Sequence, residues 1–307
     1  MLWATMGLLT IMAGTNTPQA KTPPQKVILD TDIGDDVDDA YALALIASSK
    51  SVRLLGVTTA FGETQKRAQL AAKLLAVMGR KEVPVFAGRA GDFKIREQYA
   101  WAKDFQSKSL RSQPAVEFLR ESIERNPGEV TLVAIGALTN VSDLLKKYPE
   151  VKPKIKRIVI MGGAVYVGYN NMAPPVVEWN IRCDPPAAKV VFQSGVPLVM
   201  AGLEATTMLR FEIARQKRLS AIGTPTTDAI AALTMLWGNN VPILFDCMAV
   251  AYATGDRFCE EEQQHVEIEP NGMTRITPGT PNVTVLVKPQ KEAFLDWHIE
   301  ALRPTKR

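Results

Sequence analysis

The sequence predicts an α/β fold in which an open, mostly parallel sheet is flanked by helices within a single domain. Apolar runs of strand length alternate with helical patterns through most of the 307 residues, as they do when crossover helices join parallel strands. The apolar fraction of 46%, without a low-complexity stretch, indicates one well-packed core. Polar and glycine-containing segments follow several expected strands, at the edge where open parallel sheets bind their ligands.

The first two thirds of the chain show this alternation most clearly. A short apolar strand at 27–30 leads into an Ala- and Leu-rich helix at 38–49, and a continuous apolar strand follows at 52–58. The next helix, 63–78, places Leu70 and Leu74 on one face. Further strands are expected at 83–86, 130–135, 155–161 and 196–200, and further helices at 115–125, 141–147 and 184–193.

The remaining segments are less regular. Between residues 89 and 112 the pattern weakens, and we expect either a mobile flap or an ordered excursion over the site. The last third is expected to contain helices near 211–221 and 228–239, an apolar run at 243–251, strands at 264–269 and 282–287, and a final helix at 293–302.

The first 25 residues differ in kind from the rest, and we expect a signal peptide with a linker ahead of a folded domain at 26–307. Leu2 to Met12 is apolar but too short to span a bilayer, and Ala20 offers a cleavage point. Export to the periplasm or the medium is therefore expected, with no membrane span in the mature chain. The alternative is an N-terminal extension of a cytoplasmic protein.

An unusual acidic run follows the first expected strand directly. Six of the ten residues from Asp30 to Asp39 are aspartate, in the run DTDIGDDVDD. Two carboxylates about 5 Å apart repel by roughly 3 kcal/mol at an effective dielectric near 20, so a converging group needs bulk water or a cation. Oxygen ligands without His or Cys suit a hard ion, and Ca²⁺ accepts them in looser geometry than Mg²⁺. The alternative is a solvated loop that caps the next helix.

Two further segments place polar groups where chemistry is expected. Glu178, Trp179 and Asn180 put a carboxylate and an amide on the same side of an extended chain, which suits binding of vicinal hydroxyls, with the indole as a pocket wall. A surface loop is the alternative. Asp246 lies within the apolar run 243–251, where a buried carboxylate is costly unless it is paired or bound to a metal. Its alternative is a helix N-cap.

Composition and motifs argue against several function classes. The net charge of +4 comes from scattered basic residues, which gives no support to nucleic-acid binding. The two histidines, His265 and His298, lie in late segments, and neither is expected to act as a general acid or a ligand. The chain has no G-x-S-x-G, G-x-G-x-x-G or Walker A motif, and its three cysteines are interpreted as ordinary thiols. Of the reaction types considered, hydrolysis by a metal-bound water with an aspartate as base is the one that the residues still favour.

In combination, five segments resemble the inosine-uridine-preferring nucleoside hydrolase family. They are VILDTDIGDDVDDAYALALI, VAIGALTNVSDLL, MGGA at 161–164, Glu178-Trp179-Asn180 followed by Asp184-Pro185, and Phe245-Asp246. The resemblance implies a single open α/β catalytic domain, spanning 26–307, that binds one Ca²⁺. It also implies cleavage of the N-glycosidic bond of ribonucleosides to ribose and free base by a homo-oligomer, commonly a dimer or tetramer.

The resemblance also implies roles for individual residues. Asp32 is similar to the family's general base and metal ligand. The further calcium ligands would be Asp39, Asp246 and the main-chain carbonyl of Ile135. The ribose hydroxyls would be held by Asp38, Asn171, Glu178 and Asn180, with Phe245 near the base.

Three departures from the family pattern affect these roles. The acidic run has two more residues between Asp32 and the 38–39 pair than the shorter family form, so Asp36 is an alternative to one of the assigned aspartates. Phe245 stands where many members carry His, and Glu63 where many carry Asn. Without that imidazole, the departing base would be stabilised by stacking on Phe245 and Trp179, by solvent, or by a flap residue such as Tyr99.

Two other functions compete with this interpretation. A metal-dependent phosphohydrolase also carries D-T-D after a strand, but this chain lacks a phosphate cradle with a placed lysine. A nucleoside- or ribose-binding protein could keep the fold without turnover, although the presence of Asp32 argues against that.

Overall fold

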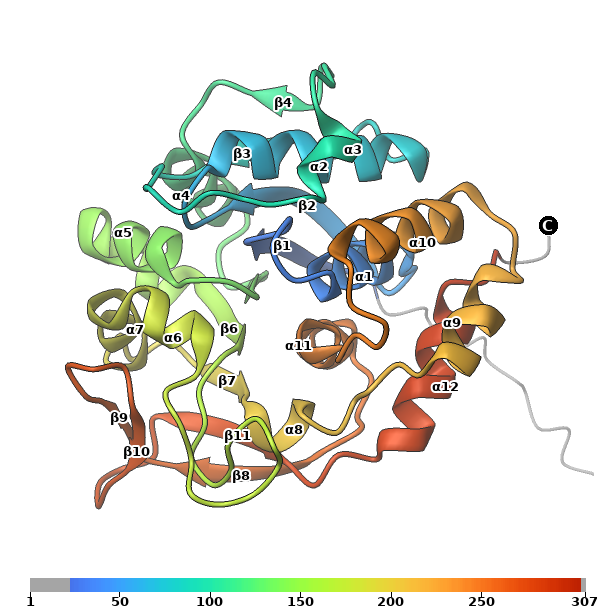
Figure 1. Cartoon of the computed structure of the whole chain (residues 1–307). Coiled ribbons are helices and arrows are strands. Elements are labelled where there is room, and N and C mark those ends of the chain that lie inside the picture. The colour runs from blue at the N-terminus through green and yellow to red at the C-terminus, as the bar shows by residue number, and fades with distance from the viewer. Residues whose placement is uncertain (1–22, 305–307) are drawn as a thin grey trace, which may run out of the picture.

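The computed structural model describes residues 23–304, so the expected signal segment lies almost entirely outside the described residues. Within that range, nine strands form one sheet in the order β4-β3-β2-β1-β5-β6-β7-β11-β8 (Figure 1). Neighbouring strands run parallel except β8, which pairs antiparallel with β11 at the edge. A separate antiparallel pair joins β9 and β10. The predicted open, mostly parallel α/β fold is confirmed.

The strands are β1 (Gln25–Thr31), β2 (Val52–Thr59), β3 (Val85–Ala87), β4 (Leu110–Arg111), β5 (Val130–Ala134), β6 (Ile155–Met161), β7 (Leu198–Ala201), β8 (Glu260–Gln264), β9 (Val266–Ile268), β10 (Thr274–Ile276) and β11 (Val283–Val287). The helices are α1 (Asp38–Ser48), α2 (Thr64–Val77), α3 (Tyr99–Ala102), α4 (Ala115–Arg125), α5 (Thr139–Lys147), η1 (Pro149–Lys154), α6 (Trp179–Cys183), α7 (Pro185–Phe192), α8 (Leu203–Thr206), α9 (Ile213–Ser220), α10 (Pro225–Trp237), α11 (Phe245–Thr254) and α12 (Lys291–Ala301). None of these helices is long and apolar enough to cross a membrane.

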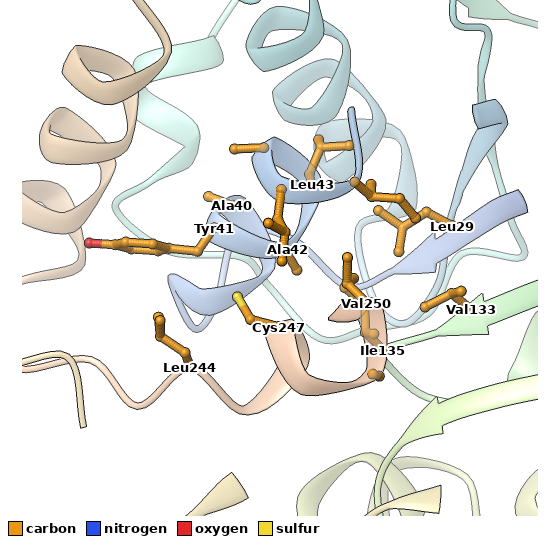
Figure 2. Packing of buried hydrophobic residues seen from close by; sticks show 14 of the residues in the cluster. Leu29, Ala40, Tyr41, Ala42, Leu43, Val133, Ile135, Leu244, Cys247 and Val250 are labelled. Carbon is orange, nitrogen blue, oxygen red and sulfur yellow. The ribbon is translucent and has the colours of Figure 1, made fainter. Parts of the chain in front are cut away.

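Helices cover both faces of the sheet and create two cores. Helices α4, α5 and α7 lie on one side, whereas α1, α11 and α12 lie on the other (Figure 1). Helix α1 is buried from Asp38 to Ala47, because it is surrounded by the sheet and by α2, α10, α11 and α12. Its alanines allow close approach, and Figure 2 shows Ala42 of α1 near Cys247 and Val250 of α11.

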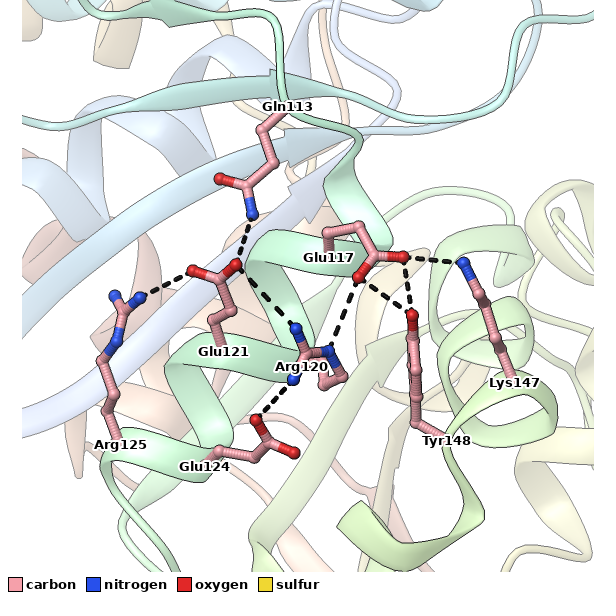
Figure 3. Close-up of polar contacts among 8 residues, drawn as sticks. All are labelled: Gln113, Glu117, Arg120, Glu121, Glu124, Arg125, Lys147 and Tyr148. Carbon is pink, nitrogen blue, oxygen red and sulfur yellow. Dashed lines mark hydrogen bonds and ion pairs between the residues drawn. The ribbon is translucent and has the colours of Figure 1, made fainter.

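On the face of the sheet covered by α4, α5 and α7, a network of charged side chains links α4 to α5 at the surface. Glu117 accepts from Lys147 Nζ at 2.7 Å and from the Tyr148 hydroxyl, and Arg120 reaches Glu124 at 2.6 Å (Figure 3). Exposed pairs of this kind contribute about 0–1 kcal/mol each. Each acidic group in this network has a basic partner, whereas Asp38, Asp39 and Asp246 at the sheet edge form no ion pair among the described residues.

Several elements can be compared with the sequence predictions. The strand expected at 264–269 is confirmed as β9, which is shorter and pairs with β10 outside the main sheet, whereas β8 at Glu260–Gln264 was not predicted. The extended chain expected at 178–180 is wrong, because α6 begins at Trp179. Segment 89–112 contains α3 and β4, which agrees with the ordered excursion that was one of the two alternatives for it.

Candidate active site

A pocket of about 410 Å³ opens at the carboxyl edge of the sheet, beyond the ends of β1, β5 and β6. Its volume is within the usual range for sites that bind small molecules. The residues that line it are Asp32, Asp35, Asp36, Asp38, Asp39, Arg96, Glu97, Ile135, Met161, Tyr169, Glu178, Trp179, Asn180, Trp237, Asn239, Phe245 and Asp246.

The acidic core of the pocket lies where two helices begin. Asp38 and Asp39 occupy the first turn of α1 and Asp246 the first turn of α11, and their ligand oxygens all lie within 4.8 Å of one another. The backbone N–H of Asp246 donates to Asp38 Oδ2 at 3.1 Å, and Thr31 Oγ1 donates to Asp39 Oδ1. All three side chains are buried, and Asp246 does not cap α11, so the alternatives of a solvated loop and of an N-cap are both wrong.

Asp32 follows β1 and is held from two sides. The Arg67 guanidinium is fully buried, and its Nη1 donates to the main-chain oxygens of Asp32 and Ile33. On the other side, a Cβ at Gly136 would lie 2.7 Å from Asp32 Oδ1, so only glycine leaves room for the carboxylate there. These contacts fix the direction of the Asp32 side chain relative to the neighbouring strand end.

Burial raises the pKa values of these carboxyl groups. The pKa of Asp32 rises to about 6 through burial, against the opposing effect of Arg67, and that of Asp36 also rises to about 6 through burial. The pKa values of Asp38, Asp39 and Asp246 lie well above the ordinary range, first because of burial and then because of neighbouring carboxylates. The side chains therefore need added positive charge to be ionised together at neutral pH.

The donor set of this group fits a hard divalent cation. Every candidate ligand atom is oxygen: the clustered carboxylates of Asp38, Asp39 and Asp246, and the carboxylate of Asp32 and the carbonyl of Ile135, two residues that line the same pocket. Among the described residues, no Lys or Arg forms an ion pair with Asp38, Asp39 or Asp246. An oxygen-only cluster without an ion-pair partner is the kind of site that binds Ca²⁺ or Mg²⁺. Asp36 instead accepts from the N–H of Val37 at 2.6 Å, and the structure groups Asp38 and Asp39, rather than Asp36, with Asp246.

Glu178 and Asn180 form the opposite wall, supplied by α6. The Glu178 carboxylate is the N-cap of this helix and accepts from the N–H groups of Asn180 at 3.0 Å, Ile181 at 3.1 Å and Gly163 at 2.9 Å. Its pKa is raised by burial. Asn180 Nδ2 donates to the Ile135 carbonyl at 3.2 Å, which ties this wall to the strand end that carries a candidate metal ligand.

Aromatic side chains form the outer part of the pocket. Trp179 packs edge-on against Phe61 and Phe93, with ring centroids 6.3 and 6.0 Å apart, and Phe245 packs against Tyr169. The sequence analysis did not single out Tyr169, or Trp237 and Asn239 at the end of α10. The only signal for Tyr169 is an aromatic residue in the polar loop after Gly162-Gly163.

Three residues from the sequence analysis lie outside the pocket lining. Asn171 is exposed, and its Oδ1 accepts from Thr207 Oγ1 at 3.2 Å. Glu63 accepts from the N–H of Ile95 at 3.2 Å and pairs with Lys66 at 2.8 Å. The Tyr99 hydroxyl donates to Gln69 at 2.7 Å. The structure therefore brings together Asp32, Asp38, Asp39, Ile135, Glu178, Trp179, Asn180, Phe245 and Asp246, with Asp36 at the rim.

A second layer behind Asp32 was also missed by the sequence analysis. Asn140 Nδ2 donates to Asp30 Oδ1 at 2.7 Å and to the Thr59 carbonyl at 3.0 Å, and Thr58 Oγ1 donates to the same Asp30 oxygen. These side chains connect the ends of β1 and β2 with the start of α5, and so position the strand end that carries Asp32.

Solved structures of nucleoside hydrolases share this fold. A purine-preferring ribonucleoside hydrolase from Gardnerella vaginalis is 25% identical, with a TM-score of 0.79 over 91% of this chain and 98% of its own. A plant nucleoside hydrolase is 24% identical, with a TM-score of 0.81 over 91% and 99%. The fold and the all-oxygen acidic pocket therefore define the class of protein: a hydrolase that acts on N-glycosyl compounds.

Sequence comparison identifies the family within this class. The model of the inosine-uridine preferring nucleoside hydrolases matches residues 27–296. A pyrimidine-specific ribonucleoside hydrolase, RihA, from Salmonella arizonae is 33% identical over 90% of this chain and 98% of its own length. The RihA protein from Citrobacter koseri is 31% identical over 90% and 97%. This chain belongs to the inosine-uridine preferring nucleoside hydrolase family, and the resemblance found in the sequence is confirmed.

Proposed function

We propose that this enzyme hydrolyses the N-glycosidic bond of ribonucleosides to ribose and free base, and that it depends on calcium. The observation that carries the proposal is the acidic cluster of Asp38, Asp39 and Asp246, which is buried in the pocket that Asp32 also lines and, among the described residues, has no ion pair with Lys or Arg. Family membership supports the reaction, and the oxygen-only donor set supports the metal.

Four groups would hold the calcium ion: the carboxylates of Asp32, Asp39 and Asp246, and the carbonyl of Ile135. When bound, the ion would offset the repulsion among these carboxylates and make a coordinated water more acidic. Asn180 supports this set, because its amide already holds the Ile135 carbonyl in place.

The chain's own residues perform the remaining tasks. Asp32 would take a proton from the attacking water, since its carboxylate faces the pocket and its direction is fixed by Arg67 and Gly136. Asp38, Glu178 and Asn180 would bind ribose hydroxyls. Sugar cleavage of this kind develops positive charge on the ribose ring, which the surrounding carboxylates stabilise.

The test is ribose release from a panel of ribonucleosides, including uridine, cytidine, inosine and adenosine, measured as reducing sugar. We expect release that a chelator abolishes and added Ca²⁺ restores. Release that is unaffected by the chelator would contradict the calcium dependence. Turnover of 4-nitrophenyl phosphate without ribose release would favour a phosphohydrolase, and tight nucleoside binding without ribose release would favour a binding protein.

We also propose export and self-association. The apolar segment ahead of residue 23 supports export, and mass spectrometry of the mature N-terminus in periplasmic and medium fractions tests it. An intact first residue in the cytoplasmic fraction would contradict it. Light scattering during size exclusion tests for a dimer or tetramer.

A further inference from the structure

The pocket contains no imidazole to assist the departing base. Among the described residues, His298 is fully buried against the rings of Tyr41, Phe211 and Phe294, and His265 binds the Thr280 carbonyl at 2.7 Å; neither lines the pocket. When the bond between ribose and base breaks, its electron pair moves onto the base. A hydrogen-bond donor at that position lowers the barrier.

Tyr169 offers such a donor at the aromatic end of the pocket. Its ring packs edge-on against Phe245, with centroids 6.2 Å apart, and its side chain is 46% exposed at the pocket mouth. The backbone N–H of Trp179 donates to the Tyr169 oxygen at 2.8 Å. The phenol therefore already accepts one hydrogen bond, and its own hydrogen is free to point elsewhere.

We propose that Tyr169 donates a hydrogen bond to the departing base and so replaces the imidazole that many relatives carry. This inference rests on the proposed function. In the reaction, water oxygen bonds to the ribose carbon as the bond to the base nitrogen breaks. The water proton passes to Asp32, and the electron pair of the broken bond passes to the base, where the Tyr169 hydroxyl stabilises it until solvent supplies a proton.

The surroundings of Tyr169 suit this role. Partial burial of the phenol and, next in size, the nearby Glu178 carboxylate raise the pKa of Tyr169 above its ordinary value, so the hydroxyl keeps its hydrogen at neutral pH. The loop is held in place by a turn in which the N–H of Asn171 donates to the Gly168 carbonyl at 2.9 Å, and by the contact of Asn171 with Thr207. Arg96, a cationic donor on the same pocket, instead lies 3.8 Å from Asp35.

The leaving-group dependence of Tyr169→Phe tests the proposal in the full-length, calcium-loaded enzyme. Turnover of uridine or inosine is expected to fall about 10- to 100-fold, the effect of losing a hydrogen bond to a charged group. Turnover of 4-nitrophenyl riboside, whose leaving group departs without such help, is expected to fall less than about threefold. Because the side chain is at the pocket mouth, this variant is expected to fold normally, and a thermal melt checks this.

Tyr166→Phe is the matched control, since Tyr166 lies in the same loop but its hydroxyl donates to Glu262 at 2.8 Å, outside the pocket. It is expected to leave turnover of both substrates unchanged. An equal loss of both substrates in Tyr169→Phe would mean that the hydroxyl only positions Trp179, and unchanged nucleoside turnover would also overturn the proposal. If the wild-type enzyme cleaves 4-nitrophenyl riboside but no nucleoside, the proposed function fails, which the wild-type assay alone reveals.

Discussion

Replacing Asp246 by asparagine should make the metal-free protein more stable and the calcium-loaded protein less stable. The ligand oxygens of Asp38, Asp39 and Asp246 lie within 4.8 Å of one another. Each ionised pair at that distance costs about 3 kcal/mol at an effective dielectric near 20. Raised pKa values already relieve part of this repulsion, because the carboxyls bind protons. We therefore expect Asp246→Asn to gain about 1–3 kcal/mol without metal, of the size of the repulsion within one pair.

Calcium is expected to reverse the order of the two proteins. Wild-type protein at a calcium concentration of 1,000 times Kd should gain about 4.1 kcal/mol, which exceeds the advantage of about 1–3 kcal/mol expected for the metal-free variant. The variant, which has lost one ligand, should gain little at the same concentration. The backbone N–H that binds Asp38 is retained in the variant, so the helix contact itself should persist.

Thermal unfolding with and without calcium measures both effects. Asp104→Asn is the control, because Asp104 is exposed and its φ of 61° is one that asparagine also adopts readily. A metal-free Asp246→Asn protein that melts below the wild type, or one that retains the full calcium-induced rise in Tm, would refute the account of the cluster as a repulsive, cation-binding site.

Three further predictions concern Asp32 and its surroundings. The metal-free protein should be more stable near pH 5 than near pH 7.5. The pKa of Asp32 is about 6 in the folded chain instead of 3.8, so the folded state binds more protons than the unfolded state between pH 3.8 and pH 6. The free energy of unfolding therefore falls as the pH rises through this interval. A higher Tm at pH 7.5 after metal removal would contradict this. Gly136→Ala should reduce nucleoside turnover about tenfold or more by displacing Asp32, whereas Gly91→Ala, whose nearest new contact is 3.5 Å, should not; equal turnover in both variants would refute the crowding argument. Phe245→Ala should reduce purine nucleoside turnover about tenfold through lost stacking, and unchanged turnover would show that stacking does not assist the base.

Elements with a strong pattern were predictable from the sequence. The boundaries of α4 and β6 match the predictions residue for residue, because one has helical periodicity and the other is a strand with a buried apolar end. Strand β8, with the sequence EEEQQ, was not predicted, because an edge strand is defined by backbone pairing to β11 and its side chains face solvent. Helix α6 was missed because its start depends on Glu178 capping the chain, which a carboxylate and an amide two residues apart do not reveal.

Most residues of the candidate site could be predicted from the sequence, but how they come together in the fold could not. Each aspartate stood out locally, yet the choice of Asp38 and Asp39 over Asp36 depends on how α1 packs against α11. Asn171 and Glu63 were assigned by position in the family pattern, whereas their side chains bind Thr207 and Lys66 instead. Tyr169 was missed because a tyrosine among glycine and asparagine is typical of a surface loop, and only the three-dimensional path of that loop brings it beside Phe245.

The contact between the first turns of α1 and α11 has a consequence for synthesis of the protein. Asp38 and Asp246 are separated by 208 positions, so the ribosome synthesises Asp38 long before Asp246. A chain that terminates before residue 246 lacks one of the proposed calcium ligands, and we expect it to gain no protection from the ion against proteases. In the complete protein, the proposed calcium site would join the first strand end to the start of α11, so we expect ion binding to select molecules in which these two distant segments have already met.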